Sequence, residues 1–112
     1  GISVKISAKA SGSLAVPPQD LVVVIANLFE NAINEVANLK SKEGYIDIQI
    51  KDSPERLLIK IDNPCRANLT FDENLYGIGI RSVISTTSKY EGMYDFTAED
   101  GVFSAKIILN LK

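Results

Sequence analysis

The chain has 112 residues, of which 46% are hydrophobic and 23% charged, with a formal net charge of −2. This length allows one domain with one core, and the balanced charge offers neither a basic field for nucleic acid nor a polybasic patch for a membrane. There is no histidine, and Cys65 is the only cysteine. These counts exclude a Ser-His-Asp triad, a histidine-based zinc site and an internal disulfide, and they favour a reducing, cytosolic setting.

The first forty residues predict a strand followed by a long helix. Residues 2–7 alternate apolar and polar side chains, which is typical of a half-buried strand. A loop of small residues is expected over 9–13. A helix is then predicted from Pro18, because proline suits a first helical turn. Its apolar side chains continue to about Lys40, and the helix is expected to end near Ser41.

The rest of the chain predicts two hairpins with a second helix between them. Alternating patterns predict four strands, paired as 45–51 with 57–61 and 93–98 with 102–111. The first hairpin is expected to stop at Asp62-Asn63-Pro64, and Asp100-Gly101 is a strong turn signal for the second. Residues 65–76 lack periodicity and predict a polar loop, and residues 80–89 predict the shorter helix.

This order of elements predicts the fold class. A strand, a long helix and two antiparallel hairpins with a second helix favour an α+β fold, built as a two-layer α/β sandwich with a mixed sheet and helices on one face. There is no internal repeat, no low-complexity segment and no sign of a second domain. We therefore expect a single domain over residues 1–112.

A polar stripe runs along the long helix. Its members recur at steps of three and four, which places them on one helix face: Asn27, Glu30, Asn31, Asn34 and Asn38. A solvated face is the simpler explanation, but such a face normally carries basic residues, and asparagine is a mediocre helix former. Amides beside a carboxylate suit an oxygen-rich ligand and a hard cation such as Mg²⁺. The helix alone leaves both explanations open.

Two short segments add to this pattern. Asp62-Asn63-Pro64 follows a predicted strand, and Gly77-Ile78-Gly79-Ile80 opens the second helix. A glycine pair before a helix is common as a simple turn. It also suits phosphate, because glycine lets the backbone approach a ligand closely and first-turn N–H groups bind anions.

In this order and spacing, the three segments resemble the GHKL (Bergerat-fold) ATPase domain of sensor histidine kinases. NLFENAINEV is similar to the N box, IDNP to a reduced G1 box without its usual glycines, and YGIGIRSV to the G2 box. The resemblance covers roughly residues 18–111. It is closest to the AgrC-like quorum-sensing subtype, whose kinases pair with LytTR-type regulators.

The resemblance implies Mg-ATP as the ligand and assigns roles along the long helix. Asn31 would ligate Mg²⁺, and Glu30 would be the catalytic carboxylate that polarises the attacking group. Asn27 would face the phosphates. Asn34 belongs to the same nucleotide-binding set, at a position where many histidine kinases carry lysine or histidine.

The other two boxes would hold the base and the phosphates. Asp62 or Asn63 would accept the hydrogen bond of the adenine amine, and the choice between them stays open. The remaining set would bind phosphate through backbone N–H groups and one cation: Gly77, Ile78, Gly79, Ile80 and Arg81.

The resemblance also implies the biological setting. The γ-phosphate would pass to a histidine on a separate dimerisation helix, and a response regulator would be the next partner. The chain would be a piece of a longer kinase, in the cytoplasmic part of a membrane-bound receptor, without direct contact to membrane or nucleic acid. Two alternatives remain: a degenerate nucleotide-binding or interaction module without catalysis, and an anti-sigma-factor serine kinase of the same fold.

Overall fold

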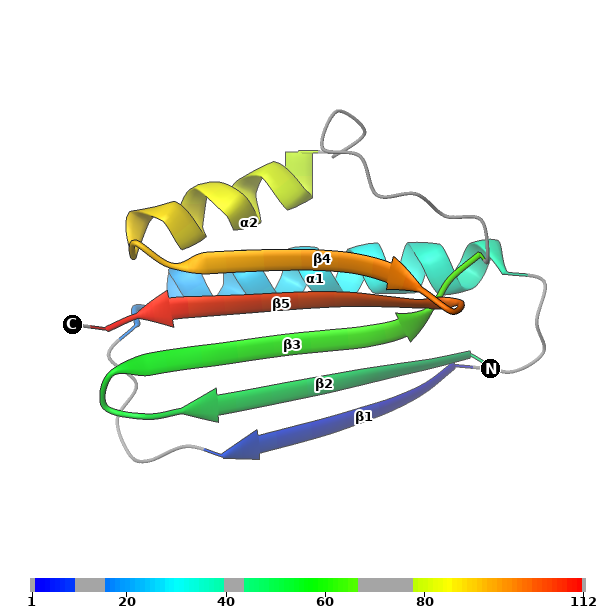
Figure 1. Cartoon of the computed structure of the whole chain (residues 1–112), viewed down its shortest axis with the longest axis horizontal. Helices are drawn as coiled ribbons and strands as arrows, with labels where there is room; N and C mark the ends of the chain where they lie inside the picture. Colours follow the sequence, from blue (N-terminus) through cyan, green and yellow to red (C-terminus); the bar gives the residue numbers. More distant parts are fainter. Residues whose placement is uncertain (1, 10–15, 40–43, 67–77, 112) are drawn as a thin grey trace.

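The computed structural model describes residues 2–9, 16–39, 44–66 and 78–111 (Figure 1). Within them the chain forms five strands and two helices. Their order is β1 (Ile2–Lys9), α1 (Pro18–Asn38), β2 (Gly44–Asp52), β3 (Arg56–Pro64), α2 (Ile78–Lys89), β4 (Met93–Glu99) and β5 (Val102–Asn110).

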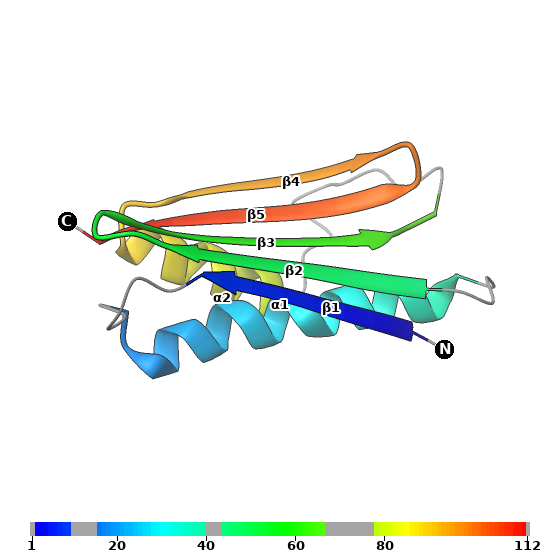
Figure 2. The same ribbon diagram turned by 90° about the horizontal axis from the view of Figure 1, so that it is seen from below.

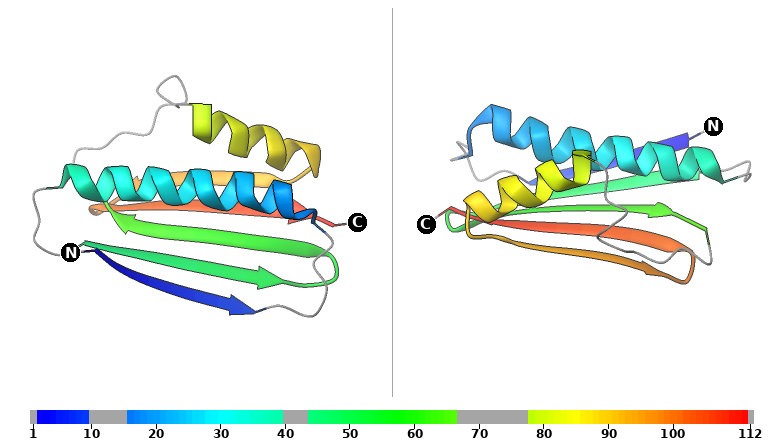
Figure 3. Two further views of the ribbon diagram at one scale, coloured as in Figure 1. Left: turned by 180° about the vertical axis from the view of Figure 1, so that it is seen from behind. Right: turned by 90° about the horizontal axis from the view of Figure 1, so that it is seen from above.

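The strands form one mixed sheet in the order β1-β2-β3-β5-β4. β1 pairs with β2 in parallel, and the other neighbours are antiparallel. Both helices lie against the same face of the sheet, which Figure 2 shows in side view and Figure 3 from two further directions. The predicted two-layer α+β fold is confirmed. Neither described helix has the length and hydropathy of a membrane-spanning segment.

The core lies between the sheet and the helices. Every fourth residue of α1 is buried, which gives the helix one continuous apolar stripe: Val24, Leu28, Ala32 and Val36. In β3 the odd-numbered residues Leu57, Ile59 and Ile61 are buried. Because successive side chains of a strand point to opposite faces, this alternation identifies the odd-numbered positions of β3 as those facing the helices.

Several predicted boundaries need correction. β1 continues through Lys9 into the predicted loop, α1 ends at Asn38, and α2 begins at Ile78. The expected stop of β3 at Asp62-Asn63-Pro64 was wrong, because these residues pair with β5 from Ser104 to Val102. Proline is tolerated at the end of a strand, where few ladder hydrogen bonds remain. Most of the predicted polar loop lies outside the described residues.

The β4–β5 turn follows the sequence signal. Asp100 and Gly101 have φ angles of 52° and 76°. A type I′ turn requires positive φ at both central residues, and its twist matches that of the paired strands. The Asp-Gly prediction is confirmed.

A polar cluster joins the two helices at the start of α1. Asp20 is only 7% exposed, and its carboxylate accepts hydrogen bonds from the Tyr90 hydroxyl and, at 3.0 Å, from Lys89 Nζ. The Tyr90 bond and then the Lys89 bond lower the pKa of Asp20 below its usual value. Burial, followed by the bond to Asp20, raises the pKa of Tyr90 to about 12. The cluster therefore favours ionised Asp20 together with neutral Tyr90.

We expect this cluster to shape stability at both ends of the pH scale. Because folding lowers the pKa of Asp20, the carboxylate contributes to the free energy of unfolding at pH values above its ordinary pKa of 3.8. This contribution is lost as the pH falls below that value. Folding raises the pKa of Tyr90, so its contribution is lost as pH rises from 10.0 to about 12. Asp20→Asn should lower the melting temperature at neutral pH and flatten its decline in acid.

Thermal unfolding followed against pH measures this effect. The exposed Asp95→Asn on β4 is the matched control and should leave the acid decline unchanged. An acid decline as steep in Asp20→Asn as in the wild-type chain would contradict the assignment.

Candidate functional site

A polar pocket of about 150 Å³ lies between α1 and the first turn of α2. It is lined by six residues of the predicted site: Asn27, Glu30, Asn31, Asn34, Gly79 and Ile80. The polar stripe lies next to the buried apolar stripe on the surface of α1. When the apolar stripe packs on the sheet, the amides of the polar stripe therefore lie beside α2. Asn31 is half-buried rather than fully exposed as a surface stripe implies, and Glu30 is exposed.

Asn27 and Gly79 set the spacing of the two helices at the pocket. The Asn27 amide donates from Nδ2 to the carbonyl oxygen of Val23 at 2.7 Å, which leaves its oxygen on the side of α2. A Cβ atom built on Gly79 would lie 2.8 Å from this oxygen, so a larger residue would require the Asn27 amide to shift. Glycine therefore permits the present position of the Asn27 amide, and one donor of that amide is used within its own helix.

The start of α2 is suited to an anion. The first-turn N–H groups of a helix lack partners within the helix, and the helix dipole adds positive character there. This turn contains no acidic residue, and the exposed Arg81 adds a positive charge. Ile80 is buried and anchors the turn in the core, while Gly77 lies outside the described residues. Ile78 and Gly79 provide the first N–H groups of α2.

The pocket is better suited to a Mg²⁺ ion that is already bound to phosphates than to an ion held by protein ligands alone. The described part of the chain has no group of three histidine, cysteine or acidic side chains that could hold a metal. Mg²⁺ keeps several waters and commonly takes only one or two protein oxygens beside those of a substrate phosphate. Asn31 and Glu30 line the pocket, and their amide and carboxylate oxygens are of the type that Mg²⁺ takes from a protein.

Asp62 and Asn63 face opposite sides of the sheet. Asp62 lies on the face without helices, where it accepts a hydrogen bond from the Ser104 hydroxyl and lies 3.6 Å from Lys60 Nζ. Asn63 lies on the helix-covered face and is 1% exposed. Its Nδ2 donates to the Pro64 carbonyl at 2.9 Å. Its Oδ1 is buried and has no hydrogen-bond donor among the described residues.

An ion pair that the sequence did not predict joins the end of β3 to α1. Arg66 Nε lies 3.2 Å from Glu35 Oε1. Glu35 is one helical turn beyond Asn31, so the pair brings Arg66 close to the polar stripe. The partners are 31 positions apart in the chain, and no local pattern indicates such a contact.

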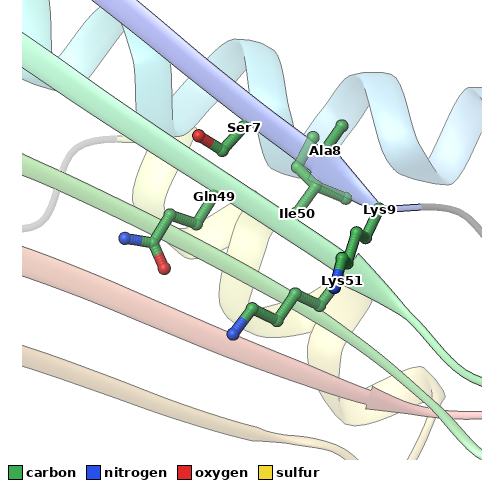
Figure 4. A pocket seen from close by; sticks show the side chains of 6 residues that line it. All are labelled: Ser7, Ala8, Lys9, Gln49, Ile50 and Lys51. Carbon is green, nitrogen blue, oxygen red and sulfur yellow. The ribbon is translucent and has the colours of Figure 1, made fainter.

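Two other pockets contain none of the predicted site residues. One of about 220 Å³ lies at the edge of the sheet and is lined by Ser7, Ala8, Lys9, Gln49, Ile50 and Lys51 (Figure 4). The other, of about 300 Å³, lies on α1 and has an apolar lining: Leu21, Val22, Ile25, Ala26 and Phe29. Neither combines an amide-rich surface with a helix N-terminus, so the α1–α2 pocket is the candidate site.

Comparison with known proteins agrees with this architecture. A sequence profile of the GHKL domain matches residues 16–110. The probable C4-dicarboxylate sensor kinase of Bacillus subtilis (strain 168) is 35% identical over 80 residues, which cover 70% of this chain and 15% of that protein. The chain therefore spans only a small part of the length of this relative.

Solved structures share the fold at low sequence identity. The histidine kinase domain of the Erythrobacter litoralis EL346 blue-light activated histidine kinase has a TM-score of 0.80 and 16% identity, over 98% of this chain and 52% of that chain. The Acinetobacter baumannii histidine kinase AdeS has a TM-score of 0.78 and 15% identity, over 99% and 55%. With a profile match that covers most of its length and the fold of histidine kinase domains, this chain belongs to the GHKL domain family.

Proposed function

We propose that this chain is the Mg-ATP-binding catalytic domain of a two-component sensor histidine kinase. The observation that carries the proposal is the α1–α2 pocket. In this pocket the amides and the carboxylate of α1 lie opposite the first turn of α2, whose N–H groups are suited to phosphate. A triphosphate with its Mg²⁺ needs both kinds of group: oxygens for the cation and N–H donors for the phosphates.

In this proposal each wall of the pocket has its own task. Asn31 gives its amide oxygen to the Mg²⁺ of the Mg-ATP complex, and Asn34 contributes polar contacts one turn away. Asn27 keeps α2 at close distance through its contact with Gly79. The N–H groups from Gly77 to Ile80 receive the phosphates, and Arg81 adds positive charge. Asn63 rather than Asp62 reads the base, because it lies on the helix side of the sheet.

The chemistry asked of the chain is mainly positioning and charge neutralisation. The γ-phosphoryl group passes from ATP to an imidazole nitrogen, and ADP is the leaving group. Since the chain has no histidine, the acceptor comes from a separate dimerisation helix. Glu30, an exposed carboxylate on the pocket wall, accepts a hydrogen bond from the second imidazole nitrogen and so makes the attacking nitrogen more nucleophilic.

The finer assignments rest on the sequence motifs. The reduced G1 box IDNP and the G2 run YGIGIRSV support an AgrC-like kinase, with a LytTR-type regulator as its partner. The Bacillus subtilis relative is a probable sensor kinase, which supports a place in the cytoplasmic part of a membrane-bound receptor. The second candidate is a nucleotide-binding or interaction module without catalysis, and its best support is the lack of glycine in the G1 box.

Phosphotransfer in the full-length kinase tests the proposal. After incubation with γ-labelled ATP, we expect Mg²⁺-dependent label on histidine, which acid removes and base preserves. Glu30→Gln should slow labelling without weakening ATP binding. Label on serine would instead support the anti-sigma-factor kinase, and nucleotide binding without any label would support the module.

A further inference from the structure

The Asp20 cluster joins the two helices at the end of α2 that lies farthest from the candidate pocket. Asp20, near the start of α1, accepts hydrogen bonds from the Tyr90 hydroxyl and, at 3.0 Å, from Lys89 Nζ. Lys89 is the last residue of α2, and Tyr90 follows it directly. Because α1 and α2 run in opposite directions (Figure 3), the first turn of α2 lies beside the middle of α1, at the pocket.

The end of α2 is also fixed against the sheet. The N–H group of Gly92 donates to the Thr87 carbonyl oxygen at 3.0 Å, which closes the last turn of α2. A Cβ atom on Gly92 would lie 2.1 Å from the Ile108 carbonyl oxygen, so the chain passes very close to β5 here. The Tyr90 ring is half-buried and packs against the core. This end of α2 is therefore held from two sides, by Asp20 of α1 and by β5.

A helix that is fixed at one end transmits its tilt to the other end. α2 has 12 residues. At about 1.5 Å per residue its length is about 18 Å, so a tilt of about 10° at its C-terminal end would move its first turn by about 3 Å. That displacement is as long as a hydrogen bond. Gly79 in the first turn lies so close to Asn27 that a Cβ atom would be 2.8 Å from the Asn27 amide oxygen. The distance between the first turn of α2 and the amides of α1 therefore depends on the tilt of α2.

We propose that Asp20 and Tyr90 are positioning residues for the triphosphate, which act by holding α2 at the tilt that brings its first turn beside Asn31. The inference rests on the proposed function, because it requires that the α1–α2 pocket bind Mg-ATP. Neither Asp20 nor Tyr90 lines the pocket. Loss of the bond between them allows α2 to sample other tilts, and only the fraction of molecules with the competent tilt then binds the triphosphate tightly.

Calorimetric titration with Mg-ATP tests the inference. Tyr90→Phe removes one hydroxyl and keeps the ring that packs against the core. It should weaken Mg-ATP binding about fivefold or more, the lower end of the range for coupling between separate sites. Asp20→Asn should weaken binding at least as much, because it also weakens the contact with Lys89. The effects of the two substitutions should be less than additive, because both act on the same bond.

Ser53→Ala is the matched control for Tyr90→Phe. It also removes one hydrogen-bonded hydroxyl, which lies in the β2–β3 turn and bonds with the N–H group and the carbonyl oxygen of Arg56, both at 3.1 Å. This variant should keep the wild-type affinity for Mg-ATP, whatever its effect on the melting temperature. If Tyr90→Phe binds Mg-ATP as tightly as Ser53→Ala does, the inference is wrong.

The amide signals of the nucleotide-free chain separate a positioning role from a structural one. In a proton–nitrogen correlation spectrum, Tyr90→Phe should shift the backbone signal of Gly79 and the side-chain NH₂ signals of Asn27, at the other end of α2. A residue that only stabilises the fold would lower the melting temperature and leave these signals in place. Unchanged Gly79 and Asn27 signals would overturn the inference while leaving the proposed function intact. Failure of the wild-type chain to bind Mg-ATP would overturn the two together.

Discussion

Replacing Asn31 with alanine is expected to weaken Mg²⁺-dependent ATP binding by at least about 10- to 100-fold, the range found even for supporting residues around a metal. Asn31 lines the α1–α2 pocket and supplies the amide oxygen assigned to the cation. The side chain is polar and half-buried, and its loss removes no apolar core group, so the melting temperature should change by no more than a few degrees. The fluorescence of a labelled ATP, titrated with and without Mg²⁺, measures the loss.

The matched control for this variant is Asn38→Ala. Asn38 has the same side chain, lies on the same polar stripe of α1 and is exposed, but it does not line the pocket. It should bind the labelled nucleotide like the wild-type chain. If Asn31→Ala binds as tightly as Asn38→Ala in the presence of Mg²⁺, the metal assignment is wrong.

The largest loss of stability is expected from Gly92→Ala, at about 3 kcal/mol or more, the upper end of the cost of overpacking. A Cβ atom on Gly92 would lie 2.1 Å from the carbonyl oxygen of Ile108 and 3.1 Å from the Thr87 carbonyl oxygen. Both are backbone atoms held in β5 and at the end of α2, so neither moves away at low cost. Denaturant unfolding followed by circular dichroism measures the effect.

Gly101→Ala is the control for this substitution. A Cβ atom there meets nothing closer than the Cys65 carbonyl oxygen at 3.9 Å. Its φ of 76° is strained for alanine, so the cost should be about 1–2 kcal/mol. A smaller loss for Gly92→Ala than for Gly101→Ala would show that the close approach of Gly92 does not limit the fold.

The sequence was sufficient to predict the two layers of the fold, because the spacing of apolar residues along a helix or strand shows which of its faces is buried. The odd-numbered apolar residues of β3 predicted a strand, and the Asp100-Gly101 turn was predicted with its strand pair. The end of β3 could not be read in the same way. Asp62, Asn63 and Pro64 are residues typical of turns, but pairing with β5, and for Asp62 also with β2, keeps them extended.

The candidate site was predictable where its residues share one helix. The spacing of the stripe on α1 placed Asn27, Glu30, Asn31 and Asn34 together without knowledge of the fold. Contacts between distant segments left no such signal, as with Asp20 and Tyr90 or Glu35 and Arg66. The sequence does carry a signal for the choice between Asp62 and Asn63. Continuing the alternation of the buried residues Ile59 and Ile61 places Asn63 on the buried face.

Calorimetric titration of the chain with a non-hydrolysable ATP analogue, with and without Mg²⁺, measures directly whether the α1–α2 pocket binds Mg-ATP. We expect saturable binding that requires Mg²⁺, because the amide oxygen of Asn31 binds the cation and the first turn of α2 binds the phosphates. Absence of heat at millimolar analogue in the presence of Mg²⁺, from a chain that melts cooperatively, would contradict it.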